Sequence, residues 1–232
     1  MNRSAIVAAL AAAALLGSTP PALAAPPRHS SIFAGYEVSK PTAHLRNVTA
    51  TFVVPRITCE HEFGGVGPAV LVYSHVNPRT GAHRTSGGGV GVACEDGNAF
   101  YESVFIVNDR TVQQGLVGFS PGDVVVVSVT VTRAHTSVSI DDRTAGTSMS
   151  HGGAGHVASQ TFVGDSSVTV NGVSGELNPF SKTHATGVRI DGRPLAKNHP
   201  HRYVWARDGK TLVTASALTA GENFTLTFRS GG

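Results

Sequence analysis

The sequence predicts an all-β protein built from antiparallel strands in a sandwich or barrel. Short runs rich in valine, isoleucine, threonine and phenylalanine recur along the chain, and turn signals separate them every ~8–12 residues. The 27 glycines and 12 prolines supply those turns. After the N-terminal segment, the sequence lacks the helical periodicity of apolar residues that marks an amphipathic helix.

The N-terminal segment has the features of a secretory signal peptide at residues 1–24. Met1 to Arg3 carries positive charge, Ser4 to Gly17 is apolar, and Ala22-Leu23-Ala24 is a small-residue cleavage motif. The apolar run is too short to cross a bilayer, and no later run in the sequence is long enough. We therefore expect cleavage after Ala24, a secreted, extracellular protein, and no membrane span.

After the signal, we expect a flexible leader at residues 25–31 and a single β-sandwich domain at residues 32–230. All-β domains of ~200–250 residues are common, and no linker or internal repeat divides this chain. Charged residues make up 14% of the sequence and the net charge is +3, with lysine and arginine scattered. That pattern argues against a nucleic-acid-binding surface. We expect a monomer that needs no cofactor.

The clearest predicted strands are residues 45–54 and 124–132, where apolar and polar residues alternate. Between them, Thr85 to Val107 predicts a hairpin at the centre of the fold. Its first strand holds the run Gly87-Gly88-Gly89-Val90-Gly91, and Glu95-Asp96-Gly97 forms its turn. The glycine run is not a phosphate loop, because it lacks the Gly-Lys-Ser/Thr ending and a following helix.

Later segments are shorter and richer in glycine and serine. We expect a glycine-rich loop at residues 151–155, and strands at 160–163 and 168–173 around a turn at 164–166. Trp205, the only tryptophan, is expected in the core or at its rim.

The two cysteines, Cys59 and Cys94, favour one disulfide. Export to an oxidising compartment permits the bond, and an even cysteine count favours it. A ring of this size stabilises a fold by roughly 4 kcal/mol in the chain-entropy model. Two free, buried thiols are the alternative.

The eleven histidines do not predict a metal site. The closest pairs are His151 with His156 and His199 with His201. A zinc site needs three or four converging ligands, and neither pair has a further cysteine or carboxylate nearby in sequence. We expect solvated loop histidines and no bound metal.

Six motifs resemble, in order, those of the glutamic peptidases, the eqolisin family of secreted acid endopeptidases. They span roughly residues 32–229 and are Phe33-Ala34-Gly35-Tyr36, Thr49 to Pro55, Val90 to Gly97 with Tyr101, Ser120-Pro121-Gly122-Asp123, Asp142 to Gly146, and Asn223 to Thr227. The resemblance implies an antiparallel β-sandwich of two large sheets, of the concanavalin A-like lectin/glucanase type. It also implies an active site in the concave face of the sandwich.

The resemblance further implies a catalytic pair, which this sequence lacks. In the family, a glutamate acts as general base on a water, and a glutamine amide holds that water and stabilises the oxyanion. The glutamine position falls on Gly87 and the glutamate position on Gly164, so no catalytic residue is assigned by match. Val104-Phe105-Ile106-Val107 also replaces the aromatic and acidic run that lines the family's cleft.

Three functions stay open at this point. The first is a secreted, non-hydrolytic pseudoenzyme that binds a peptide or protein segment in the concave face. The second is an active acid endopeptidase with a relocated catalytic acid. Its candidates are Glu102, whose pKa burial in the cavity would raise, and Gln160. The alternative for Glu102 is an outward, solvated charge. The third function is a lectin-like carbohydrate-binding module.

Overall fold

The computed structural model describes residues 25–40, 44–62, 64–77, 82–114, 118–168 and 176–229. These residues form strands and one short 3-10 helix, η1 (Leu195–Asn198). The strands are β1 (Arg28–Ser30), β2 (Phe33–Ser39), β3 (Asn47–Val53), β4 (Gly65–Asn77), β5 (Ala82–Glu95), β6 (Asn98–Val107), β7 (Arg110–Gln114), β8 (Val124–Val131), β9 (His135–Asp142), β10 (Thr147–Ala154), β11 (Gln160–Val168), β12 (Thr183–Ile190), β13 (Arg193–Pro194), β14 (His201–Arg207), β15 (Lys210–Ala215) and β16 (Phe224–Phe228).

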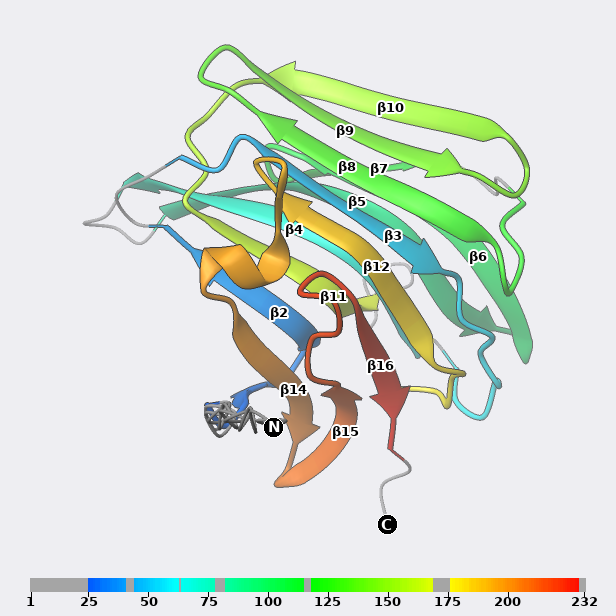
Figure 1. The fold of residues 1–232 in the computed structure, drawn as a ribbon. Coiled ribbons are helices and arrows are strands. Elements are labelled where there is room, and N and C mark those ends of the chain that lie inside the picture. The colour runs from blue at the N-terminus through cyan, green and yellow to red at the C-terminus, as the bar shows by residue number, and fades with distance from the viewer. Residues whose placement is uncertain are drawn as a thin grey trace, which may run out of the picture.

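The strands form one continuous sheet that folds over into two layers (Figure 1). Hydrogen bonds join them in the order β10-β9-β8-β3-β12-β16-β15-β14-β2-β11-β4-β5-β6-β7. The layers pack face to face, because β4, β5 and β6 lie against β8 and β9. In Figure 1, β8, β3 and β12 lie in front of β5, β4 and β11. The predicted antiparallel β-sandwich is therefore confirmed.

The core lies between the layers and follows from alternation along each strand. Val125, Val127 and Val129 of β8 are fully buried, while the intervening residues are only partly covered. In the opposite layer, a Cβ added at Gly88 would meet Val138 and Ile140 of β9, so Gly88 faces the core. Trp205 is also in the core, with 1% of its surface exposed.

Three segments are strands where the sequence predicted otherwise. β11 continues through residues 164–166, where a turn was expected, because it pairs with β2 on one side and β4 on the other. β10 includes His151 to Ala154, expected in a loop, because it pairs along its length with β9. β1 lies within the expected leader and pairs with β14. The predicted signal peptide and most of the strand predicted at 168–173 lie outside the described residues.

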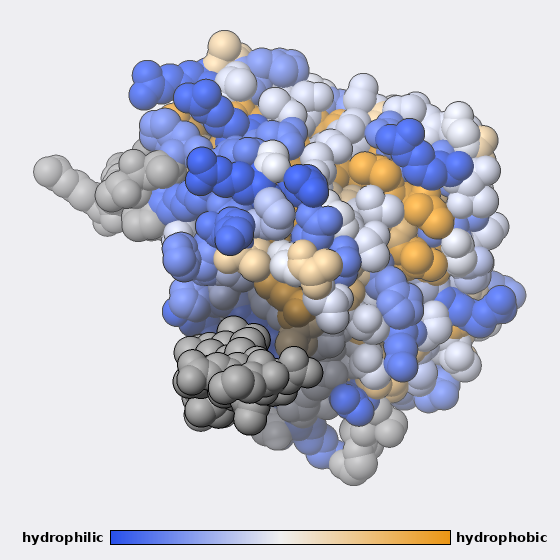
Figure 2. Space-filling view, in the orientation of Figure 1, coloured by the Kyte–Doolittle hydropathy of each residue, from blue (hydrophilic) through white to orange (hydrophobic). Residues whose placement is uncertain are grey.

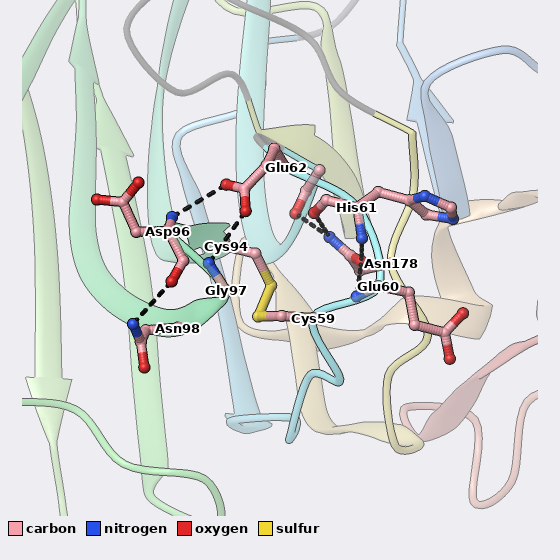
Figure 3. Close-up of a disulfide and its surroundings, with 10 residues drawn as sticks. Cys59, Glu60, His61, Glu62, Cys94, Asp96, Gly97, Asn98 and Asn178 are labelled. Atoms are coloured by element: carbon pink, nitrogen blue, oxygen red, sulfur yellow. Dashed lines mark hydrogen bonds between the residues drawn. A yellow bond between two sulfur atoms is a disulfide. The ribbon is translucent and has the colours of Figure 1, made fainter.

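The predicted central hairpin is present as β5 and β6, and its turn is fixed by neighbouring side chains (Figure 3). A disulfide joins Cys94 on β5 to Cys59, as the sequence predicted. The Glu62 carboxylate accepts hydrogen bonds from the backbone N–H groups of Asp96 and Gly97, both at 3.0 Å. These contacts tie the hairpin turn to the loop that precedes β4.

A second anchor holds the same loop from the other side. The Asn178 side chain is fully buried, and its Oδ1 accepts hydrogen bonds from the backbone N–H groups of Glu60 and His61 (Figure 3). Its Nδ2 donates to the backbone oxygens of His61 and Gly64 at 2.8 and 2.9 Å. All the hydrogen-bonding capacity of this buried amide is therefore used to shape the loop.

The outer face of the β8–β3–β12 layer is mixed in character (Figure 2). Apolar colour gathers over β8 and the end of β3, where Val53, Val124 and Val126 are incompletely buried. Across the described part of the chain, no helix is long and apolar enough to span a bilayer.

Candidate binding groove

The candidate site lies on the outer face of β14, β2, β11, β4, β5 and β6, which we call the groove face. Strand alternation decides which side chains reach it. On β11, Thr161, Val163 and Asp165 point into the core and are buried. Gln160, Phe162, Gly164 and Ser166 therefore lie on the groove face, and they are aligned with Tyr73, Leu71, Ala69 and Gly67 of β4.

Two hollows lie side by side on this face and together form the groove. The first has a volume of about 280 Å³ and is lined by Ser30, Ile32, Phe33, Leu71, Tyr73, Gln160, Phe162 and Ser166. The second has a volume of about 180 Å³ and is lined mainly by small and aliphatic residues of β4, β5 and β6. Leu71 and Ser166 line both hollows, so the two are contiguous.

Aromatic rings surround the first hollow. The Phe162 ring contacts three others edge to face, with centroid distances of 5.3 Å to Phe33, 5.2 Å to Tyr73 and 6.2 Å to Tyr203. Phe33 and Tyr203 also meet each other at 6.1 Å. Phe162, Tyr73 and Tyr203 stay half-exposed, which leaves apolar ring surface open to a ligand.

A polar cluster lies at the β2 side of the aromatic rings. Glu37 is only 4% exposed, and its Oε1 accepts a hydrogen bond of 2.7 Å from Gln160 Nε2. Its Oε2 lies 3.5 Å from Arg28 Nη1, which also lies 3.5 Å from the Tyr203 hydroxyl. Arg28 Nη2 lies 3.4 Å from His201 Nε2. The buried carboxylate is therefore hydrogen-bonded and compensated by a cation, as a buried charge requires.

The middle of the groove face has no side chains larger than a methyl group. Gly35 on β2 is opposite Gly164 on β11, which is opposite Ala69 on β4, which is opposite Gly89 on β5. These four residues form a row across the sheet, which we call the groove floor. Because these residues have no side chain larger than a methyl group, the backbones of neighbouring strands approach closely.

The three glycines of the groove floor and the adjacent Gly87 have no room for a side chain. A Cβ added at Gly164 would lie 2.1 Å from the Ala34 backbone oxygen, and one at Gly87 would lie 2.2 Å from the Val70 oxygen. Gly35 and Gly164 also have φ angles of +145° and +158°, which residues with a Cβ rarely adopt. The two positions matched to the family's catalytic pair are therefore empty of side chains and sterically closed.

Glu102 lies in the second hollow, near the opposite end of the groove from Gln160. It is half-buried on β6 opposite Gly91, and burial raises its pKa. The strand register puts Gln160 three strands away and more than ~20 Å distant. The structure therefore does not bring Glu102 and Gln160 together, and Gln160 contacts Glu37 instead.

Asp165 is a buried carboxyl beneath the groove floor, on the inward face of β11. It is fully buried, and among the described residues no hydrogen bond of normal geometry reaches either carboxylate oxygen. Burial raises its pKa from 3.8 to about 7, and the nearby Thr183 side chain opposes that shift. The proton is therefore retained on Asp165 at acidic pH.

The histidines do not form a metal centre within the part of the chain that the structure describes. His201 is exposed at the start of β14 and His199 ends η1. His151 and His156 are half-buried rather than solvated, contrary to expectation, and their Nε2 atoms have no hydrogen-bond partner among the described residues. Packing explains the difference for His151, whose ring lies 4.6 Å from the Phe105 ring, centroid to centroid.

Solved structures with the same fold are glutamic peptidases. Scytalido-glutamic peptidase with a transition state analog inhibitor has a TM-score of 0.68 and 15% sequence identity, covering 86% of this chain and 98% of that chain. Aspergilloglutamic peptidase from Aspergillus niger has a TM-score of 0.57 and 18% identity, covering 72% of this chain and 99% of that chain. At these identities the likeness establishes the fold alone. A comparison with curated proteins gives no match.

The family follows from the sequence rather than from these structures. The model of the peptidase A4 family matches residues 31–164, which is more than half of the chain. The protein therefore belongs to the peptidase A4 family, and the resemblance to the glutamic peptidases is confirmed. The matched span includes β2, the central hairpin and β11 as far as Gly164.

Sequence reasoning missed the contact between Glu37 and Gln160. The sequence signal for this contact is the even spacing of each residue from a glycine, because Glu37 is two residues from Gly35 and Gln160 is four from Gly164. Even spacings put each residue on the same face as its glycine. What the sequence does not show is that β2 and β11 are neighbours.

Proposed function

We propose that this protein is a secreted pseudoenzyme that binds an extended peptide segment in the groove without cleaving it. The observation that carries the proposal is the lack of room for a side chain at Gly87 and Gly164, where an added Cβ would lie 2.2 and 2.1 Å from backbone oxygens. Neither position holds a group that can activate a water or stabilise an oxyanion. The groove itself is retained.

The groove offers the features that a peptide ligand needs. The aromatic hollow of about 280 Å³ fits one apolar or aromatic side chain, and the groove floor admits a backbone close to the sheet. Gln160 lines that hollow and supplies a polar group at its edge. A solved relative in fold, SCP-B of the eqolisin family, was crystallised with the tripeptide Ala-Ile-His, with a TM-score of 0.61, 13% identity, and coverage of 85% of this chain and 100% of that chain.

Peptide binding is testable with an array of overlapping peptides from denatured casein. We expect the mature protein to bind peptides with a bulky apolar residue, and Phe162→Ala to weaken binding about tenfold by removing the central ring. The matched control is Val126→Ala, on the outer face of the other layer, which leaves binding unchanged. Equal loss in both variants, or no peptide bound, would contradict the proposal. Glycan binding in place of peptide binding would favour the lectin-like function.

One contact favours a second candidate function, hydrolysis by a relocated pair. Glu37 and Gln160 lie 2.7 Å apart on the groove face and are the two residue types that the family's chemistry uses. Against it, Glu37 is 4% exposed and already engaged by Arg28, which leaves little access for a water. Cleavage of casein by the wild-type protein that Glu37→Gln abolishes would establish this function instead.

A further inference from the structure

A basic pocket at one end of the sandwich lies outside the groove. Its volume is about 400 Å³, and its walls come from residues 44–46, 131–133 and 156–158. The first segment precedes β3, the second joins β8 to β9, and the third joins β10 to β11. None of its described lining residues lines either hollow of the groove.

Backbone contacts hold the three walls in place. Leu45 N–H donates to the Ala158 oxygen at 2.9 Å, and Val131 N–H donates to the Arg46 oxygen at 2.8 Å. Gly155 packs its backbone on the β8–β9 turn, because an added Cβ would lie 2.3 Å from His135 N and Thr132 O. The pocket is therefore a formed feature of the fold rather than a gap between loose loops.

The polar lining of the pocket is cationic. Arg46 and Arg133 are exposed, and within the described residues neither takes part in an ion pair. His44, Thr132 and His156 also line the pocket, and no described lining residue is acidic. Burial lowers the pKa of His156, the charge of Arg84 lowers it further, and Asp109 opposes this shift. The positive charge of the pocket therefore comes from Arg46 and Arg133.

The Asp191 carboxylate, which lies beside Arg46, already has other partners. Asp191 Oδ1 accepts hydrogen bonds from the backbone N–H groups of Arg46 and Asn47 at 2.8 and 3.0 Å. Its Oδ2 lies 3.6 Å from Lys40 Nζ. The Arg46 guanidinium therefore remains available to an anion that enters the pocket.

We propose that this pocket binds an organic ligand carrying a tetrahedral oxyanion, a phosphate or sulfate group. Arginine guanidinium groups match such oxyanions with paired hydrogen bonds. A volume of about 400 Å³ exceeds that of the oxyanion alone, and Leu45, Val131, Val157 and Ala158 give the remainder an apolar wall. This site goes beyond peptide binding in the groove and does not depend on it.

Isothermal titration calorimetry with phenyl phosphate and phenyl sulfate tests the site, at constant ionic strength because exposed charges are screened. We expect one or both probes to bind, and Arg46→Gln and Arg133→Gln each to weaken binding about tenfold. Val157→Phe fills the pocket without changing charge and should abolish binding. The matched control is Arg110→Gln, an exposed arginine on β7, which should retain binding within about twofold.

Each alternative outcome overturns the site. No binding of either probe contradicts it, and tighter binding of benzoate than of both probes contradicts the ligand class. An equal loss in Arg110→Gln shows attraction by overall charge only. A loss in Phe162→Ala places the anion in the groove. Comparing the two probes decides between phosphate and sulfate, and thermal unfolding of each variant confirms that it is folded.

Discussion

The two halves of β11 differ although they belong to one strand. In the first half, Gln160 and Phe162 project into the groove and make specific contacts with Glu37 and three aromatic rings. In the second half, Gly164 has no room for a side chain on the outside, and Asp165 is buried on the inside without a hydrogen-bond partner of normal geometry among the described residues. The strand thus carries an aromatic ring and a polar side chain in one half, and a glycine without room for a side chain in the other.

Under the function proposed above, this fold has lost its reaction without losing its groove. The backbones around Gly164 and Gly35 approach so closely that only glycine fits. The pairing of β2 with β11 therefore requires glycine at these two positions. Restoring one side chain at Gly164 is therefore not expected to restore catalysis. The following predictions test the two halves separately, from the largest expected effect to the smallest.

The largest expected effect is the pH dependence of the free energy of unfolding that Asp165 causes. Its folded pKa of about 7 is raised above the unfolded value of 3.8, so the folded state retains a proton across that range. The contribution of Asp165 to stability is fully present below about pH 4 and decreases by up to roughly 4 kcal/mol as pH rises to about 7. Urea unfolding at several pH values measures this slope.

Asp165→Asn should remove most of that pH dependence, because the amide does not titrate. The matched control is Asp208→Asn, an exposed aspartate in the β14–β15 turn, which should keep the wild-type slope. An unchanged slope in Asp165→Asn would show that other groups dominate the pH dependence.

Gly164→Ala should destabilise the protein by about 3 kcal/mol or more, because the new Cβ meets the Ala34 oxygen and φ is +158°. Gly118→Ala is the control, since a Cβ there meets no atom within 4 Å, and it should change stability by less than about 0.5 kcal/mol. Denaturant unfolding compares the two. Similar stabilities would mean that the groove floor is able to open.

Phe162→Ala should cost about 2 kcal/mol of stability, less than a fully buried phenylalanine, because its ring is half-exposed. The loss arises from the contacts with Phe33, Tyr73 and Tyr203. Denaturant unfolding at one pH measures it. A loss as large as that of Gly164→Ala would remove the distinction between the two halves.

Glu37→Gln should cost about 1 kcal/mol, because the neutral amide accepts a weaker hydrogen bond from Gln160 and loses its attraction to Arg28. The difference between the variant and the wild type should shrink at high salt, since part of the Arg28 side chain is exposed. Unfolding at low and high ionic strength tests this, and a stabilised variant would contradict it.

The sequence predicted the fold best where apolar and polar residues alternate regularly along a strand. β3, β8 and the hairpin of β5 and β6 have regular apolar faces, and both the disulfide partners and the buried Trp205 followed from simple rules. β10 and the middle of β11 were missed because glycine and serine favour turns locally. Their strand conformation comes from pairing with distant segments, which a local pattern does not contain.

The site was predictable only in part for the same reason. The motif match of Gly87 and Gly164 to the family's catalytic pair stays a prediction from sequence, and the structure adds that neither position has room for a side chain. The Glu37–Gln160 hydrogen bond joins residues 123 positions apart, on strands whose adjacency the sequence does not encode locally. Similarly, the burial of Asp165 depends on the packing of β12 against β11, and Thr183 of β12 lies near its carboxyl group.

The most direct test of the central claim is digestion of denatured casein by the purified mature protein from pH 2 to pH 8, followed by mass spectrometry. Because Gly87 and Gly164, the positions predicted for the catalytic pair, have no room for a side chain, we predict no new peptides at any pH, while casein peptides still bind the groove. Reproducible cleavage that Glu37→Gln or Glu102→Gln abolishes would contradict the account, since it would show that this groove has kept its chemistry.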